Sequence, residues 1–178
     1  MKKMLITSFL MLVFASGFSQ GEELLTEKKT QFGITGGFNQ DFFASSPYSF
    51  NGLNFYVGFF GEYKISEKFR LQIEMLYKST QGSGYNTLQF PLLLKYEISD
   101  RFRIFGGAQV NWSFEDLYID PVYDDKPGDF ALSIGVEYDL SEKWYLTARY
   151  VHGFKKFPSA SGRRAREGAF LVGVGYRF

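Results

Sequence analysis

Apolar and polar residues alternate along most of this chain. Residues 130–140 place Phe, Leu, Ile, Val, Tyr and Leu at the even positions and Ala, Ser, Gly, Glu and Asp at the odd ones. The same period of two runs through 69–78, 88–98 and 169–178. Such alternation predicts β-strands with one apolar face. Together with 31–43, 52–64, 102–113 and 144–154, these segments make eight predicted strands. Each is long enough to be a tilted membrane strand, which needs about 9–11 residues.

A nine-residue pattern occurs three times and marks the turns. It starts at Tyr63, Tyr96 and Tyr138 and reads Tyr, any residue, aliphatic, Ser, acid, base, aromatic, any residue, aliphatic. A Ser side chain bonds nearby backbone in turns, so we expect three tight hairpins with the flanking aromatic residues at matching heights on paired strands. The other connections, at 44–50, 79–86, 114–128 and 155–167, are longer and richer in Ser, Gly, Pro or charge. Short turns that alternate with long loops are typical of outer-membrane barrels.

Alternation alone leaves open whether the apolar face points into a soluble, ligand-binding barrel or out toward lipid. An eight-stranded lumen has room only for filling side chains, which favours apolar residues outside. Aromatic residues also stand at the turn-proximal strand ends, as in a membrane-interface girdle, at Tyr63, Phe69, Tyr96, Phe102, Tyr138 and Trp144. The opposite face carries charges of both signs, which could pair inside: Glu62, Lys64, Arg70, Glu74, Lys78, Lys95, Glu97, Arg103, Glu137, Arg149 and Arg177. The sequence therefore predicts an all-β fold, an eight-stranded antiparallel up-and-down transmembrane β-barrel.

The first residues have the layout of a secretory signal peptide. Lys2 and Lys3 precede an apolar run over 4–15, and small residues follow, with Gly17 and Ser19 placed for cleavage before Gln20. The run is short for a transmembrane anchor, and no Cys follows it to make a lipoprotein. We expect a signal peptide at 1–19, a short periplasmic segment at 20–30 and the barrel at 31–178.

Composition narrows the chemistry. The 178 residues include no Cys and one His, which excludes a disulfide framework, a thiolate metal site, a cysteine nucleophile and a His-rich metal centre. The formal net charge of +1 is not that of a generic nucleic-acid binder. Aromatic residues reach 20% while the mean hydropathy is only −0.17, as expected for strands with one apolar face.

Few residues are candidates for catalysis or transport. His152 is the single imidazole and falls on the apolar face near the loop end of its strand. It could be the base of a lipid-modifying barrel enzyme, but Gly153 and Phe154 follow it, with no Ser nucleophile two residues on. An interfacial histidine at headgroup level is the favoured interpretation. The inward charges could form an ion path, although a paired polar core is favoured in so narrow a barrel.

Two predicted loops carry opposite charge. The acidic one contains Glu115, Asp116, Asp120, Asp124, Asp125 and Asp129, and the basic one Lys155, Lys156, Arg163, Arg164 and Arg166. The acidic loop could bind calcium, but it lacks the spacing of an EF-hand. The loops could instead pair across the barrel mouth, the basic loop could meet lipopolysaccharide phosphates, or both could simply be solvated; the sequence leaves these last alternatives open.

Three features of the chain are distinctive when taken together: the segment from Leu88 to Tyr96, which contains Phe-Pro-Leu-Leu-Leu-Lys-Tyr; the hairpin repeat; and the closing segment 173–178. They resemble the PorT-like outer-membrane β-barrel family of Bacteroidota. The resemblance covers nearly the whole predicted mature chain. It implies an OmpA/OmpX-sized barrel in the cell outer membrane with both termini in the periplasm, and a terminal aromatic residue typical of barrel-assembly substrates. Pro91 removes one ladder hydrogen bond, and we expect a local bulge there.

These observations favour a structural or interaction protein that acts through its extracellular loops. An accessory role in protein secretion or transport, implied only by the resemblance, is the alternative, and a lipid-modifying enzyme is less favoured. We predict no catalytic, cofactor-binding or metal residues and no cofactor. The expected partners are outer-membrane lipids and lipopolysaccharide, the barrel-assembly machinery during insertion, and a secretion-machinery or surface protein; no nucleic acid is expected.

Overall fold

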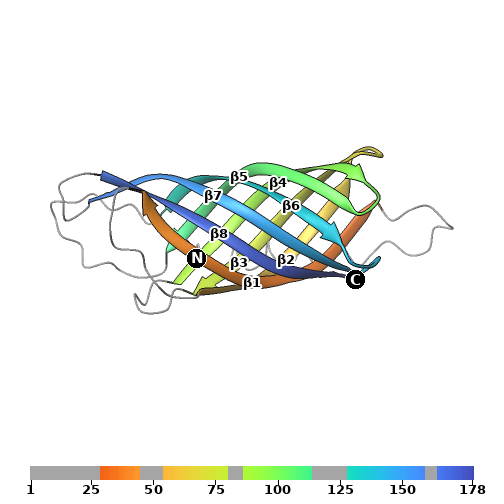
Figure 1. Cartoon of the computed structure of the whole chain (residues 1–178), viewed down its shortest axis with the longest axis horizontal. Coiled ribbons are helices and arrows are strands. Elements are labelled where there is room, and N and C mark those ends of the chain that lie inside the picture. Colours follow the sequence, from red (N-terminus) through yellow and green to blue (C-terminus); the bar gives the residue numbers. More distant parts are fainter. Residues whose placement is uncertain (1–28, 45–53, 80–85, 114–127, 159–163) are drawn as a thin grey trace, which may run out of the picture.

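The computed structural model describes residues 29–44, 54–79, 86–113, 128–158 and 164–178. They form a closed barrel in which every strand pairs antiparallel with its neighbours in sequence and β8 pairs with β1 (Figure 1). Closure pairs every strand on both sides, as a sheet in hydrocarbon requires. The predicted eight-stranded all-β barrel is therefore confirmed. Its strands are β1 (Thr30–Ala44), β2 (Asn54–Lys64), β3 (Phe69–Ser79), β4 (Asn86–Ser99), β5 (Phe102–Ser113), β6 (Gly128–Asp139), β7 (Trp144–Pro158) and β8 (Arg164–Arg177).

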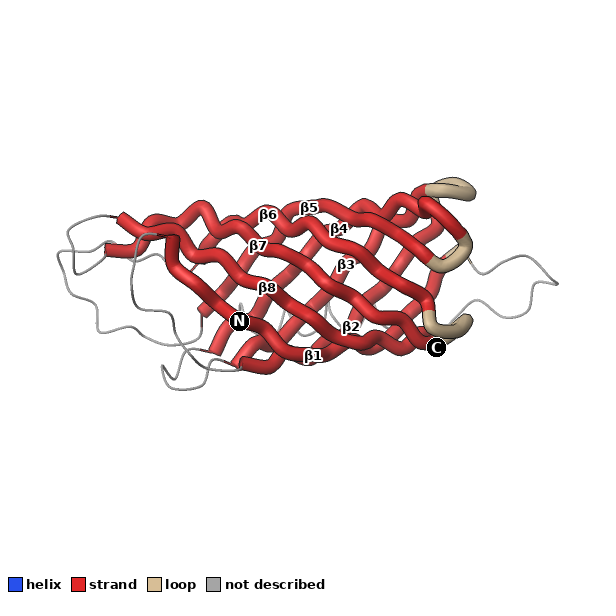
Figure 2. Tube along the Cα trace, viewed as in Figure 1, coloured by secondary structure: helices blue, strands red, loops and turns tan. Residues whose placement is uncertain are grey.

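The two ends of the barrel differ. The connections 65–68, 100–101 and 140–143 lie at one end, together with the C-terminus, as Figure 2 shows. The strand ends that border the other connections lie at the opposite end, and those connections (45–53, 80–85, 114–127 and 159–163) lie outside the described residues. We call these the turn end and the loop end. The connections at the turn end have two to four residues and those at the loop end five to fourteen, so the predicted alternation of short and long connections holds except that the β7–β8 connection is much shorter than expected.

One predicted loop is partly strand. The basic segment 155–167 was expected to be irregular, but β7 continues to Pro158 and β8 begins at Arg164. Backbone pairing places Lys156 opposite Arg166 and Pro158 opposite Arg164, after a register shift between His152 and Lys156. Cross-strand pairing here overrides the loop-like composition, so a two-stranded extension replaces most of the expected loop.

Serine side chains stabilise two of the three tight turns. The backbone N–H of Phe69 donates to Ser66 Oγ at 3.2 Å, and that of Trp144 donates to Ser141 Oγ at 3.0 Å. Backbone bonds close the same turns, as from Ile65 N to the Phe69 carbonyl at 2.9 Å. The middle turn differs, because Ser99 pairs with Phe102 after a register shift in β4. The turn chemistry read from the repeat thus holds for the first and third copies.

The repeat also joins neighbouring hairpins. Phe69 stands opposite Tyr96 of the next hairpin, with ring centroids 5.1 Å apart, and Trp144 stands opposite Tyr176 at 4.8 Å. Within its own hairpin Tyr63 faces Leu71. The aromatic residues therefore match in height between successive hairpins and not across a single turn. Cross-strand aromatic pairs of this kind stabilise a sheet.

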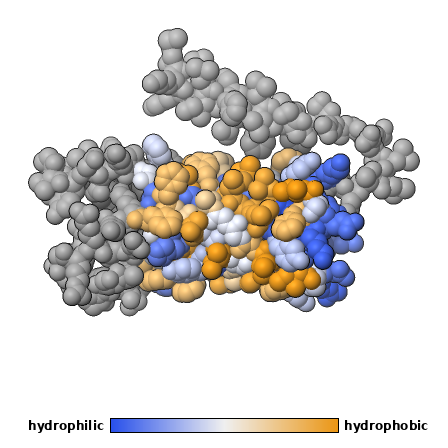
Figure 3. Space-filling view, turned by 90° about the horizontal axis from the view of Figure 1, so that it is seen from above, coloured by the Kyte–Doolittle hydropathy of each residue, from blue (hydrophilic) through white to orange (hydrophobic). Residues whose placement is uncertain are grey.

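The apolar face points outward. Phe130, Ile134 and Val172 expose 67%, 61% and 62% of their surface on the outer wall. The outward-facing strand residues within 30–42, 54–79, 86–112, 128–154 and 168–177 include no Asp, Glu, Lys or Arg. On the face seen in the space-filling view, hydrophobic side chains form a band along the barrel, and hydrophilic residues gather beyond it at the turn end (Figure 3). The predicted sidedness is confirmed.

Pro91 makes no bulge. Ile73 pairs with Leu92 and Leu76 pairs with Gln89, so the β3–β4 register is the same on both sides of the proline. Pairing is interrupted between them, and Pro91 is fully buried on the inward face. The expectation of a bulge was wrong. A bulge needs an inserted residue that shifts the register, whereas this strand keeps its register and only lacks the ladder hydrogen bond that proline cannot donate.

The outer wall gives a first testable expectation. An Ile134→Arg substitution puts a charge near the middle of the lipid-facing band and should lower the free energy of unfolding by about 2–4 kcal/mol, whereas Ile98→Arg, at the turn-end border, should cost about 0–1 kcal/mol. Urea unfolding of the protein refolded into lipid vesicles measures both. Equal costs at the two depths would contradict the membrane position of this wall.

Candidate functional site

Three groups of polar side chains fill the barrel lumen. The turn-end network comprises Glu62, Arg70, Lys95, Glu97, Arg103, Glu137, Asp139 and Arg177; the middle pair comprises Glu74 and Arg149; and the mouth cluster comprises Asn39, Asp41, Asn54 and Lys78. In each group, acidic and basic side chains are equal in number. All the charged residues that alternation assigned to the inward face lie there, buried or half-buried.

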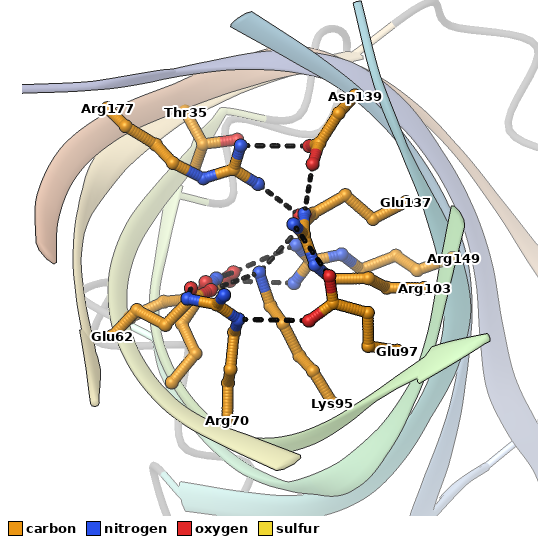
Figure 4. A network of polar contacts seen from close by, with 12 residues as sticks. Thr35, Glu62, Arg70, Lys95, Glu97, Arg103, Glu137, Asp139, Arg149 and Arg177 are labelled. Carbon is orange, nitrogen blue, oxygen red and sulfur yellow. Dashed lines mark hydrogen bonds and ion pairs between the residues drawn. The ribbon is translucent and has the colours of Figure 1, made fainter. Parts of the chain in front are cut away.

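Lys95 is the centre of the turn-end network. Its Nζ lies 2.8 Å from Glu62 Oε2 and 2.5 Å from Glu137 Oε2, although the two carboxylates come from β2 and β6 on opposite sides of the barrel. In Figure 4 these side chains converge from different strands on the lumen axis. All three are buried, at 1–2% exposure. The ammonium group of Lys95 thus forms ion pairs with carboxylates from two facing walls of the barrel.

Two arginines complete the network around Glu137. Arg103 Nη1 lies 2.9 Å from Glu137 Oε1 and 2.6 Å from Asp139 Oδ2. Arg177, the penultimate residue, contacts the same two carboxylates, at 2.8 Å to Asp139 Oδ1. Nearer the turns, Arg70 bridges Glu62 and Glu97 at 3.4 and 3.6 Å. Each charge therefore meets more than one opposite partner, as buried ions require.

Aromatic rings lie against the cations of the lumen. Tyr145 is 1% exposed and lies under the cations, with Arg177 Cζ 4.4 Å and Lys95 Nζ 5.4 Å from its ring centroid. Gly175 leaves space for that ring, because a Cβ there would be 2.0 Å from Tyr145 Cζ. Alternation listed only the charges on this face. The rings could have been found by the same parity, since Tyr145 stands two and four residues before Thr147 and Arg149.

The middle pair is a bidentate ion pair. Arg149 Nη1 lies 2.7 Å from Glu74 Oε2, and Nη2 lies 3.0 Å from Oε1. The Gln72 side-chain amide also donates to Glu74 at 2.5 Å. On the other side the guanidinium faces the ring of Phe105, at 5.4 Å from Cζ to the centroid. This fork geometry fixes both side chains across the lumen between β3 and β7.

The mouth cluster surrounds one carboxylate. Asp41 accepts from Lys78 Nζ at 2.8 Å, from Asn54 Nδ2 at 3.0 Å and from Asn39 Nδ2 at 3.2 Å. Lys78 was predicted to face inward, but Asp41 was missed. Its signal is the odd-numbered parity of β1, which it shares with Thr35 and Asn39. Beside the cluster lies a small pocket with Lys78 and Asn111 in its lining.

The charged side chains of the lumen are paired with one another. The buried carboxylates are occupied by cations, and in the part of the chain that is described no group of three or more His, Cys, Asp or Glu could hold a metal ion. No helix in that part is long and apolar enough to cross a membrane.

The acidic residues from Glu115 to Asp125, the candidates for calcium binding or loop pairing, lie outside the described residues, as do residues 1–28 with the expected signal peptide.

His152 lies on the outer wall, as its parity predicted. It is half-buried near the loop end of β7, and the Tyr150 hydroxyl lies 3.3 Å from its Nδ1. It is thus separated from the lumen groups by the wall itself. The structure brings together the predicted inward charges and leaves this imidazole apart from them.

A closed antiparallel barrel with an apolar exterior and a paired ionic interior defines a transmembrane β-barrel. The chain belongs to the outer membrane protein beta-barrel domain family, which it matches over residues 6–178. It is therefore an outer-membrane protein. No curated protein matches it.

Solved structures share the fold. A de novo designed transmembrane β-barrel is similar with a TM-score of 0.52 and 13% identity, over 86% of this chain and 98% of that one. Ail of Yersinia pestis, solved with the heparin analogue sucrose octasulfate, is similar with a TM-score of 0.51 and 12% identity, over 84% and 99%. Neisserial surface protein A gives 0.51 and 13%, over 85% and 98%.

The middle pair, Glu74 and Arg149, allows a direct test of the ionic pairing in the lumen. Glu74→Leu leaves Arg149 buried without its carboxylate and should lower the free energy of unfolding by about 3–5 kcal/mol, whereas Glu74→Leu combined with Arg149→Met should cost much less. Urea unfolding in lipid vesicles measures the cycle, with Arg149→Met as the other single variant. A double variant less stable than either single one would contradict the pairing.

Proposed function

We propose that this protein is a sealed outer-membrane scaffold that contacts other molecules through its long connections, without catalysis. The observation that carries the proposal is the filled lumen, in which Lys95 joins Glu62 to Glu137 across the barrel and Arg149 joins Glu74. Because the described side chains fill the lumen with matched ion pairs, we infer that it does not conduct solutes. The connections at the loop end are then the part of the molecule free to differ between proteins of this fold.

We propose further that the turn end faces the periplasm and the loop end faces outward. Short periplasmic turns and long extracellular loops are the rule in such barrels. The resemblance to PorT-like barrels implies the same, with both termini inside. Ail, a barrel of the same fold, was solved with a sulfated ligand, which fits a binding role for barrels this small.

An accessory role in protein secretion is the second candidate. It is supported by the segment from Phe90 to Tyr96 and by the closing strand, which resemble the PorT-like family. A lipid-modifying activity has less support, because His152 is followed by Gly153 and Phe154 and has no serine nucleophile beside it in the sequence.

Sidedness can be tested because the chain has no Cys. Single substitutions Ser83→Cys, between β3 and β4, and Glu142→Cys, in the third tight turn, place one thiol at each end. A membrane-impermeant maleimide should label the first in intact cells and the second only after the outer membrane is permeabilised. Labelling in the reverse order would overturn the orientation.

The interaction role can be tested by crosslinking in intact cells followed by purification. The full chain should recover a surface or lipid partner, and a variant with residues 114–127 replaced by an equally long Gly/Ser segment should lose it while the barrel still folds. Recovery of secretion-machinery proteins would favour the second candidate. Identical recovery by both proteins would contradict a role for this connection.

A further inference from the structure

We propose that the loop end of the lumen binds an uncharged sugar, one hydroxyl group of which enters the small pocket beside the mouth cluster. Polar side chains from β3 to β6 line one side of this pocket, and small or apolar residues from β7 and β8 line the other. The proposal goes beyond the function proposed above, because it concerns the lumen itself and not the connections. It leaves the lumen sealed, since the middle pair and the turn-end network lie deeper in the barrel.

Three polar side chains form a row across neighbouring strands of the pocket wall. Gln89 of β4 pairs directly with Asn111 of β5, and Asn111 pairs directly with Asp129 of β6. All three line the pocket, and we call them the polar row. Directly opposed residues of adjacent strands have Cβ atoms about 4.5–5.5 Å apart. The row therefore presents two carboxamides and a carboxylate side by side.

Gln89 is the residue that indicates a ligand. It is 6% exposed, and its side-chain amide has no hydrogen-bond partner among the described residues. A buried polar group without a partner costs free energy and calls for an explanation. By contrast, the buried amide of Gln72 donates to Glu74. The Gln89 amide is thus available to a group that the protein itself does not supply.

Asn111 and Asp129 extend the hydrogen-bonding surface beyond the pocket. Gln109 Nε2 donates to Asn111 Oδ1 at 2.7 Å, which leaves Asn111 Nδ2 as a donor. Both Asn111 and Asp129 are half-buried, whereas Gln89 is buried, so the row continues from the pocket toward the loop end. Carboxamides donate and accept, carboxylates accept, and a hydroxyl does both. Several neighbouring hydroxyls of one sugar therefore match the row better than a single water molecule does.

Charge favours an uncharged ligand. The described ionic groups at this end of the lumen are Asp41, Lys78 and Asp129, and Lys78 Nζ lies 2.8 Å from the Asp41 carboxylate. Two carboxylates and one ammonium group give a net negative charge. Placing a phosphate, sulfate or carboxylate group here would set like charges side by side, which is unfavourable.

The pocket is a cup and not a channel. It has room for about one water-sized group. Val151, Ala169 and Leu171 line its other side and belong to a buried apolar cluster. One hydroxyl group therefore reaches Gln89, while the rest of the sugar stays beside Asn111 and Asp129.

Isothermal titration calorimetry of the purified full chain tests the proposal, with the protein folded in a detergent that has no sugar headgroup. The probes are glucose, galactose and mannose. The control ligands are the corresponding uronates, in which a carboxylate replaces the hydroxymethyl group. The site variant is Gln89→Leu, and its matched control is Gln31→Leu, the same change on the inward face of β1 at the turn end. A second variant, Ala169→Leu, fills the pocket from its apolar side and leaves the polar row unchanged.

At least one neutral sugar should bind the original chain, and its uronate should bind more weakly. Gln89→Leu and Ala169→Leu should each weaken binding of that sugar about tenfold or more, whereas Gln31→Leu should bind like the original. Without sugar, Gln89→Leu should unfold at the same urea concentration as the original or at a higher one, because its amide loses no partner. Heat-modifiable migration in gels verifies that each barrel folds.

Absence of saturable binding by all three neutral sugars would show that the pocket holds water only, and would overturn the proposal. Tighter binding of the uronates, or unchanged affinity in Gln89→Leu, would overturn it as well. Earlier unfolding of Gln89→Leu without sugar would do the same, because the amide would then support the fold. These measurements do not depend on which end of the barrel faces outward, so the proposal can fail while the crosslinking and maleimide tests succeed, and the reverse.

Discussion

The cost of removing charge from water governs this barrel. Glu137 and Lys95 are almost completely buried, and each would be strongly destabilising alone. They persist because strands from opposite walls supply the partners: Glu62 reaches Lys95, and Arg103 and Arg177 reach Glu137. The apolar exterior is the other half of the same constraint, since lipid can solvate no charge and no unpaired backbone group. Sidedness, closure and a filled lumen therefore depend on one another.

This constraint also limits what the barrel can do. The charged side chains described in the lumen neutralise one another and so form a paired ionic core. Groups that could meet other molecules lie at its two borders. At the loop end these are the mouth cluster around Asp41 in the lumen and His152 on the outer wall.

Much of the fold could be predicted from the sequence because a period of two is unambiguous over long strands. The strand set, the sidedness and the inward charges from Glu62 to Arg177 followed from parity alone. The predictions that were wrong depended on which residues pair across strands, and parity cannot identify those pairs. Residues 155–158 were expected to be loop but form strand, because they pair with Arg164–Arg166. The expected bulge at Pro91 is absent, because the β3–β4 register does not change. The rings of Phe69 and Trp144 pair with rings on the next strand, β4 and β8, and not across their own turns. In the site, the network's connections across the lumen could not be derived, because residues on opposite walls share no local pattern.

The final strand has a particular place in this design. Arg177 of β8 supplies charge to Glu137 and Asp139 on β6, and Tyr176 completes the aromatic pair with Trp144. The same strand pairs with β1 and so closes the sheet. Loss of Arg177 would leave the two acidic groups with one cation fewer in the lumen. The strand that closes the barrel therefore also completes the charge balance of its interior.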